Sequence, residues 1–149
     1  MKIAVTGAFS YTGKYITRHL LARGEEVFTL TGHPDRPDPF DGQVKALPLD
    51  FRSPAGLVKT LQGAEVLVNT YWVRFDHRGN TQARAVENTL TLVEAARTAG
   101  VHRIVHISIT NPSPDSPLPY FRGKAENEQV PPGDGTAPAF DFRPNLAYA

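Results

Sequence analysis

One stretch of sequence decides the fold, Ile3-Ala4-Val5-Thr6-Gly7-Ala8-Phe9-Ser10-Tyr11-Thr12-Gly13-Lys14-Tyr15-Ile16. It encodes a strand, a tight turn and the start of a helix, and its opening apolar run is typical of a buried parallel strand. Gly7 supplies the backbone freedom for a sharp turn, and Gly13 lets the helix lie close to the strand. The helix N-terminus carries N–H groups and a partial positive charge, so it suits the pyrophosphate of a dinucleotide.

The turn matches most of a known dinucleotide fingerprint. The short-chain pattern Thr-Gly-x-x-Gly-x-x-Gly fits Thr6, Gly7 and Gly13, with Ser10 in place of the middle glycine. A side chain there crowds a pyrophosphate, although the Ser10 hydroxyl can donate to a phosphate oxygen. A P-loop is excluded, because five residues separate Gly7 from Gly13 and a tyrosine follows Lys14. An ordinary strand-to-helix turn remains the alternative.

Length and composition indicate a single domain over residues 1–149. The formal net charge is +1 and the cationic residues are scattered, so neither nucleic acid nor a membrane surface is indicated as a partner. The absence of cysteine excludes disulfides, zinc–thiolate sites and a thiol nucleophile. The sequence has no signal-peptide pattern and no apolar run of membrane-spanning length, so we expect a cytoplasmic protein.

Apolar runs alternate with helical periods, which predicts β-α-β units around a parallel sheet. Strands are expected at residues 2–6, 26–31, 44–48, 66–69 and 103–108. Helices are expected at residues 12–23, 54–62 and 80–99, with a helical start at 122–129. The tail from residue 129 is expected to be irregular, because Pro131 and Pro132 cannot continue a helix, and a last strand is expected near 139–143.

A second group of polar residues follows the strand at 103–108. Ser108 ends that strand, and Tyr120 and Lys124 follow with the spacing Tyr-x-x-x-Lys. Residues four apart share a helix face, so Lys124 can lie near the Tyr120 ring and favour the phenolate. A phenol is otherwise a poor general base at neutral pH. Ser108 can hydrogen-bond a substrate oxygen at the carboxyl end of the sheet. A chance surface pair of tyrosine and lysine is the alternative.

Together these residues resemble the short-chain dehydrogenase/reductase superfamily. The positions that carry the resemblance are the opening turn, Asp50, Asn69-Thr70, Ser108, Tyr120, Lys124 and Arg143-Pro144. The similarity is nearest to extended and atypical members, namely epimerase-like proteins, NmrA-like proteins and relatives of a complex I accessory subunit. It implies a Rossmann-type α/β fold, a doubly wound parallel sheet of order 3-2-1-4-5 with the last strand as a sixth, in three layers. It covers the cofactor-binding portion, and such proteins usually continue into a C-terminal substrate region.

The resemblance also implies roles for the matching positions. The pyrophosphate would be lined by Gly7, Phe9, Ser10, Tyr11 and Gly13. The rest of the cofactor would meet Asp50 and Phe51 at the adenine, Asn69, Thr70 and Tyr71 along the ribose and nicotinamide side, and Pro144 and Asn145 at the carboxamide. Ser108 would polarise the substrate oxygen, Tyr120 would be the acid/base, and Lys124 would hold the nicotinamide ribose. The implied activity is that of an NAD(P)-dependent oxidoreductase or epimerase-like protein. A non-catalytic dinucleotide-binding module, acting as a redox sensor or assembly partner, is the alternative.

The end of the strand at 26–31 bears on the choice between NAD and NADP. An acidic residue there accepts from the ribose 2′-hydroxyl and selects NAD, whereas a nearby cation accommodates the 2′-phosphate of NADP. The chain has no acidic residue at 31–33 but carries His33 and Arg36. We therefore expect NADP in preference to NAD, with His33 or Arg36 as the phosphate contact, although Asp35 dilutes the positive field.

Two further features leave alternatives open. The aromatic segment 71–75 follows the strand at 66–69, and it suits a wall of the nicotinamide or substrate pocket, a buried plug or a homodimer contact. His102 and His106 bracket the strand at 103–108, but no third ligand is spaced with them, so no metal site is expected.

Overall fold

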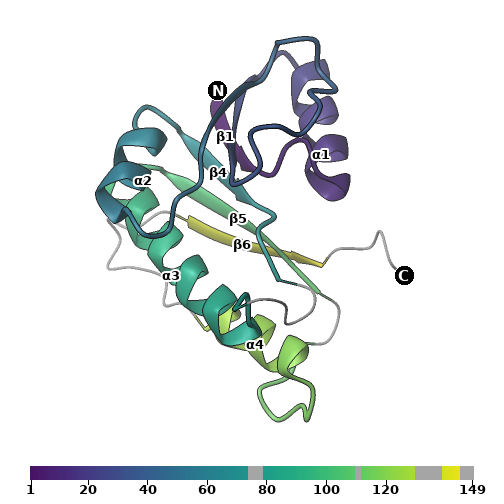
Figure 1. The fold of residues 1–149 in the computed structure, drawn as a ribbon, viewed down its shortest axis with the longest axis vertical. Helices are drawn as coiled ribbons and strands as arrows, with labels where there is room; N and C mark the ends of the chain where they lie inside the picture. Colours follow the sequence, from purple (N-terminus) through teal and green to yellow (C-terminus); the bar gives the residue numbers. More distant parts are fainter. Residues whose placement is uncertain (74–78, 110–111, 130–138, 145–149) are drawn as a thin grey trace.

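The computed structural model describes residues 1–73, 79–109 and 112–129, and the backbone of residues 139–144. Its strands form one parallel sheet of order β3-β2-β1-β4-β5-β6 (Figure 1). The strands are β1 (Lys2–Thr6), β2 (Glu26–Thr31), β3 (Lys45–Pro48), β4 (Val66–Asn69), β5 (Arg103–Ser108) and β6 (Ala139–Pro144). The order expected for the first five strands is confirmed, and the expected last strand extends the sheet beside β5.

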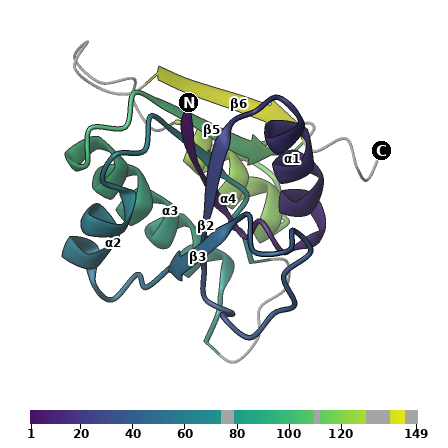
Figure 2. The same cartoon turned by 90° about the horizontal axis from the view of Figure 1, so that it is seen from above.

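The helices cover both faces of the sheet. They are α1 (Tyr11–Ala22), α2 (Pro54–Leu61), α3 (Gln82–Thr98) and α4 (Pro119–Glu128). Figure 2 shows α1 on one side of the sheet and α2 and α3 on the other. Helix α3 packs against both α2 and α4, as right-handed crossovers on one face require. The three-layer α/β/α architecture is therefore confirmed.

Local signals explain where the helices begin. The Ser53 hydroxyl caps α2 by accepting from the N–H of Gly56, and the Thr81 hydroxyl caps α3 by accepting from the N–H of Arg84. Helix α4 begins at Pro119, three residues before the expected 122, because proline is favoured in the first turn, where its missing N–H costs nothing. Tyr120 therefore lies in the same helix as Lys124, as the Tyr-x-x-x-Lys spacing requires.

The hydrophobic core lies on both faces of the central strands. The α2 and α3 side contains Leu30, Leu57, Leu61, Leu67, Leu92 and Ile104. The α1 side contains Ile3, Val5, Val27, Phe40, Val44 and Val68. Each fully buried leucine stabilises the fold by about 2 kcal/mol. This packing holds β1 and β4 side by side, so their carboxyl ends meet at one edge of the sheet.

Two expectations concern the remainder of the chain. Of the irregular tail expected at 129–149, residues 130–138 and 145–149 lie outside the described residues. Among the helices that the structure describes, none combines the length and the apolar character needed to cross a bilayer.

Candidate functional site

The glycine turn after β1 has the geometry that the sequence predicts. Gly7 adopts a φ of +66°, and its N–H donates to the Leu30 carbonyl at 2.9 Å. A Cβ atom added at Gly13 would lie 2.1 Å from the carbonyl oxygen of Gly7, so glycine is required there. Helix α1 thus starts directly against the turn. This close approach is a cradle that fits a pyrophosphate at the helix N-terminus.

Ser10 departs from the role expected for its hydroxyl. The Ser10 Oγ donates to the Gly7 carbonyl at 2.6 Å, so it points back into the turn. Ser10 is the N-cap of α1, but its side chain makes no capping hydrogen bond to the helix. The phosphate contact expected of this hydroxyl therefore competes with a bond inside the turn.

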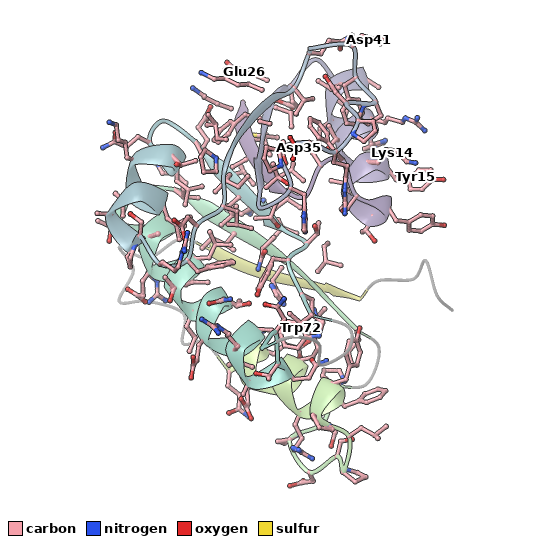
Figure 3. The ribbon with its side chains drawn as sticks, in the orientation of Figure 1. Lys14, Tyr15, Glu26, Asp35, Asp41 and Trp72 are labelled. Carbon is pink, nitrogen blue, oxygen red and sulfur yellow. The ribbon has the colours of Figure 1, made fainter. Side chains whose placement is uncertain are left out.

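The two aromatic residues beside Ser10 have different surroundings. The Phe9 ring packs against Phe40 with centroids 6.1 Å apart, and it belongs to the α1-side core. Tyr11 is 56% exposed and meets Tyr15 edge to face on the outer side of α1, where Figure 3 labels Tyr15. Because the Phe9 ring packs in the core, Phe9 would line a pyrophosphate with its backbone and not with its side chain.

A hydrogen-bond network joins the carboxyl ends of β1 and β4. The Thr6 Oγ1 donates to Asn69 Oδ1 at 3.0 Å and accepts from the N–H of Thr70 at 2.7 Å. The N–H of Tyr71 also donates to Thr6 Oγ1, at 3.1 Å. The sheet order reverses between β1 and β4, and ligands of open α/β sheets bind at such a switch point. The expected residues Asn69, Thr70 and Tyr71 are therefore brought to the glycine turn.

The network continues from β4 to β5 through a buried histidine. The Asn69 side-chain amide donates to His106 Nδ1 at 3.0 Å, which assigns the proton of a neutral ring to Nε2. Burial and then the Lys124 charge lower the pKa of His106 to about 3, so the ring is neutral near pH 7. Sequence reasoning considered His106 only as a metal ligand. The available signal was its place two residues before Ser108, on the same face of β5.

Lys124 brings α4 to the carboxyl end of β5. It is 3% exposed, and its Nζ donates to the carbonyl of Ile107 at 3.0 Å, directly before Ser108. Burial lowers the pKa of Lys124 to about 7, although the Glu128 carboxylate acts in the opposite direction. Both charge states of this amine are therefore populated near neutral pH.

The Trp72 indole packs on the side-chain amine of Lys124. The Lys124 Nζ lies 4.3 Å from the centroid of the indole, which also meets Tyr120 edge-on with centroids 6.2 Å apart. A Cβ added at Gly123 would come within 3.2 Å of two indole carbons, so this glycine leaves room for the ring. Trp72, labelled in Figure 3, is half-buried and packs against Lys124 and Tyr120 of its own chain, and the three interpretations of segment 71–75 stay predictions. Residues 74 and 75 lie outside the described residues.

Ser108 is buried at the end of β5. Within the described residues its Oγ has no hydrogen-bond partner, and the residue is 2% exposed. An unpartnered buried hydroxyl is costly, so it suits a position that a ligand completes. Pro144 pairs with Ser108 in the register of β5 and β6, which brings the expected carboxamide contact to this edge. Asn145 lies outside the described residues.

The expected adenine contacts, Asp50 and Phe51, follow the carboxyl end of β3, and the Phe51 ring meets Tyr71, which follows β4. The Phe51 and Tyr71 rings are 4.7 Å apart, and the Asn88 amide donates to the Tyr71 hydroxyl at 2.8 Å. Asp50 accepts from the backbone N–H and the Nε of Arg52, each at 3.0 Å. This bonding lowers the pKa of Asp50, so its carboxylate stays ionised at neutral pH.

A hollow of about 350 Å³ opens beside Asp50. Its polar lining includes Thr31, Asp50 and Arg52. His33 and Arg36, the cations expected to contact a 2′-phosphate, are exposed on the loop after β2 and do not line it. Sequence reasoning did not select Arg52, although its position two residues after Asp50 favours an Asp side chain that bonds the local backbone.

A second hollow, of about 500 Å³, lies at the amino ends of the strands. Lys2, Glu26 and Lys45, the first residues of β1, β2 and β3, line it. Ligands of parallel α/β sheets bind beyond the carboxyl ends of the strands. The hollow beside Asp50 is therefore the one that belongs with the glycine turn.

Comparison with known proteins agrees with this site. A sequence profile described as NAD(P)H-binding matches residues 7–130, which include the glycine turn and the Tyr-x-x-x-Lys helix. The chain belongs to this NAD(P)H-binding family. The family makes NAD(P) the cofactor.

Individual proteins are similar to this chain over part of their own length. An uncharacterized protein of Mycobacterium tuberculosis is 32% identical over 108 residues, covering 72% of this chain and 12% of that protein. The mitochondrial NADH dehydrogenase (ubiquinone) 1 alpha subcomplex subunit 9 of Mus musculus is 28% identical over 136 residues, covering 84% and 35%. The triphenylmethane reductase of Citrobacter sp., solved with NADP(H), superposes with a TM-score of 0.76 at 22% identity, covering 97% and 49%. The chain thus spans about half of that structure and smaller parts of the two relatives.

Proposed function

We propose that this family member is the cofactor-binding part of an NADP(H)-dependent oxidoreductase that acts on a carbonyl or alcohol. One observation carries the proposal. The Nζ of Lys124 reaches the carbonyl of Ile107, directly before Ser108, from the helix that also holds Tyr120. These are the three residue types that a short-chain reductase site requires, and they come from β5 and α4 at the end of the sheet nearest the glycine turn.

The cofactor would be held by residues from the ends of β1, β3 and β4 and from helix α4. The Gly7–Gly13 turn and the N-terminus of α1 would take the pyrophosphate, because backbone N–H groups suit phosphate oxygens. Asp50 and Phe51 would meet the adenine, Tyr71 would lie along the ribose and nicotinamide side, and Lys124 would hold the nicotinamide ribose. The neutral His106 supports this arrangement, since a second cation beside Lys124 would repel it.

The protein side of the chemistry is acid–base. The nicotinamide, when bound, supplies or accepts the hydride. The Ser108 hydroxyl would donate a hydrogen bond to the substrate oxygen, and the Tyr120 phenol would give this oxygen a proton during reduction and take it back during oxidation. A cationic Lys124 would stabilise the phenolate that remains on Tyr120.

A specific observation also favours the second candidate, a non-catalytic dinucleotide-binding module. Ser108 and Lys124 are 2% and 3% exposed, and the Trp72 indole lies against the Lys124 ammonium group. A substrate oxygen would have to enter a closed site. A sensor or assembly partner needs only the cofactor half, whose glycine turn is preformed.

Substitution of Tyr120 separates the two candidates. For the enzyme, Tyr120→Phe lowers NADPH-dependent reduction of a panel of carbonyl compounds by about 100-fold or more, with the Kd for NADPH unchanged. Tyr15→Phe, on the outer face of α1, is the matched control and leaves both quantities unchanged. Cofactor binding without turnover of any compound in the panel would support the module instead.

A further inference from the structure

We infer that the Asp50–Arg52 pair selects the substituent on the adenosine ribose, with Arg52 as the cation that binds a 2′-phosphate. This inference rests on the proposed NADP(H) function and identifies the residues that discriminate NADP from NAD. It moves the phosphate contact from the loop after β2 to the loop after β3.

The place of the pair in the sheet is the first step. Thr31 ends β2 and pairs with Pro48 of β3, and the N–H of Leu49 donates to the Thr31 carbonyl at 3.0 Å. Asp50 follows directly, so the pair lies beside the carboxyl end of β2. Rossmann folds recognise the ribose 2′-substituent at this strand end.

The hollow supplies the space. It measures about 350 Å³, and Thr31, Gly32, Asp50 and Arg52 contribute to its wall. It therefore brings the end of β2 and the Asp50–Arg52 pair to a single opening. Ala46, Leu47, Pro48 and Leu49 form much of the remaining wall, and Leu47 and Leu49 also pack against the core. Thr31, Asp50 and Arg52 therefore supply the polar groups that a ribose and its substituent would meet.

The Asp50 carboxylate orients the guanidinium of Arg52. Oδ1 accepts from the Arg52 backbone N–H and Nε, each at 3.0 Å, and Oδ2 accepts from Nη2 at 3.4 Å. A guanidinium carries five N–H groups in a fixed plane, and these bonds engage two of them. The Arg52 side chain is 87% exposed, so the other N–H groups can face an anion. A planar fork of donors suits a phosphate.

Charge explains why both members of the pair matter. The Asp50 carboxylate alone would accept from a 2′-hydroxyl and repel a 2′-phosphate, which carries nearly two negative charges. Arg52 reverses this preference by adding a cation at the same opening. Removal of either member uncovers the other, so the two substitutions have opposite effects on the ratio of affinities.

Calorimetric titration of the full chain with NADPH and NADH tests the inference. For Arg52→Ala we expect NADPH affinity to fall by about tenfold or more, with NADH affinity equal or higher. For Asp50→Asn we expect the ratio of affinities to move toward NADPH, even if a lost adenine contact weakens both cofactors. Arg23→Ala, exposed at the end of α1 away from the glycine turn, is the matched control, and we expect less than about a twofold change in the ratio.

Titration with the fragments 2′,5′-ADP and 5′-AMP repeats the comparison without the nicotinamide half of the cofactor. Arg52→Ala should weaken the binding of 2′,5′-ADP and leave that of 5′-AMP unchanged. Suppose that the wild-type chain binds both cofactors and that Arg52→Ala changes the ratio of NADPH to NADH affinity by less than about threefold. The role inferred for Asp50 and Arg52 is then wrong, and the proposed function stands. A comparable drop in the NADPH affinity of Arg36→Ala or His33→Ala would assign the 2′-phosphate contact to the loop after β2. Wild-type chain that binds neither cofactor would overturn both proposals. Arg52 is exposed, so its substitution leaves the fold intact, which circular dichroism checks.

Discussion

Gly13 is the residue on which the cofactor turn depends. Its backbone φ is not in the left-handed region, so the requirement for glycine is purely steric. The obstacle is the Gly7 carbonyl, which is backbone and cannot rotate away as a side chain would. A dinucleotide site that needs α1 this close to β1 therefore tolerates no side chain at this position.

We expect Gly13→Ala to lower the free energy of unfolding by about 3 kcal/mol, because the new Cβ would lie 2.1 Å from the Gly7 oxygen. Urea denaturation measures the loss. Gly32→Ala is the matched control, since Gly32 has open space around it and no positive φ. Equal stabilities for the two variants would contradict the packing described for the turn.

Lys124 gives a second prediction at this scale, through pH. Its pKa falls from 10.5 to about 7 on folding, so between these values the unfolded chain holds more protons than the folded chain. Stability contributed by this group therefore rises with pH across this window, by at most about 1.4 kcal/mol per pH unit, and the full penalty is present below pH 7. Urea denaturation at pH 7 and pH 9 should show a steeper rise for wild type than for Lys124→Met. Parallel pH dependences in the two proteins would rule out the buried amine.

Sequence reasoning found the residues whose role is local. Gly7 and Gly13 were predictable because the turn that needs them is contiguous, and Lys124 because a spacing of four defines a helix face. The bond between Asn69 and His106 joins residues 37 apart in sequence, so only the register of β4 and β5 reveals it. The role inferred for Arg52 could not be predicted, because only the structure shows that this exposed arginine lines a hollow beside Asp50.

At the scale of elements, the β1–β4 junction joins the glycine turn to the end of β4. Thr6 Oγ1 bonds three groups at the end of β4, so one hydroxyl sets how the glycine turn lies against the ribose-side residues. This is a feature of two strand ends and not of either strand alone.

We expect Thr6→Val to cost about 2 kcal/mol, because the variant keeps the shape but leaves the N–H of Thr70 and the Asn69 oxygen without this partner. Thr98→Val removes an exposed hydroxyl that bonds the Glu94 carbonyl within α3, so it should stay within about 0.5 kcal/mol of wild type. Thermal or urea unfolding measures both. A Thr6→Val protein as stable as Thr98→Val would show that the junction contributes nothing.

Most elements were predictable because apolar runs and helix caps mark them directly. The bounds of β1, β2, β4 and β5 equal the expected ones, and those of β3, α1, α2 and α3 differ by at most two residues. The start of α4 differs by three, because proline breaks a helix interior and the expected start at 122 therefore lay beyond Pro119. Pro119 in fact occupies the first turn of the helix.

At the scale of the whole molecule, the residues proposed to hold the cofactor follow five neighbouring strands of the sheet. The ends of β1, β2, β3, β4 and β5 contribute the glycine turn, the hollow, the aromatic pair, the Asn69 network and Ser108. The substrate could not be predicted, because the described residues that would face it, Ser108 and Lys124, are buried against this chain's own groups. Cofactor binding is therefore the central claim, and catalysis follows from it only if the site opens.

Calorimetric titration of the chain with NADPH and with NADH tests that claim most directly. We expect saturable binding of at least one cofactor with a Kd of about 100 µM or tighter, NADPH being the stronger, and loss of this binding in any folded fraction of Gly13→Ala. Absence of binding heat for both cofactors at concentrations up to about 1 mM, with the sole tryptophan, Trp72, also unchanged in fluorescence, would contradict the account.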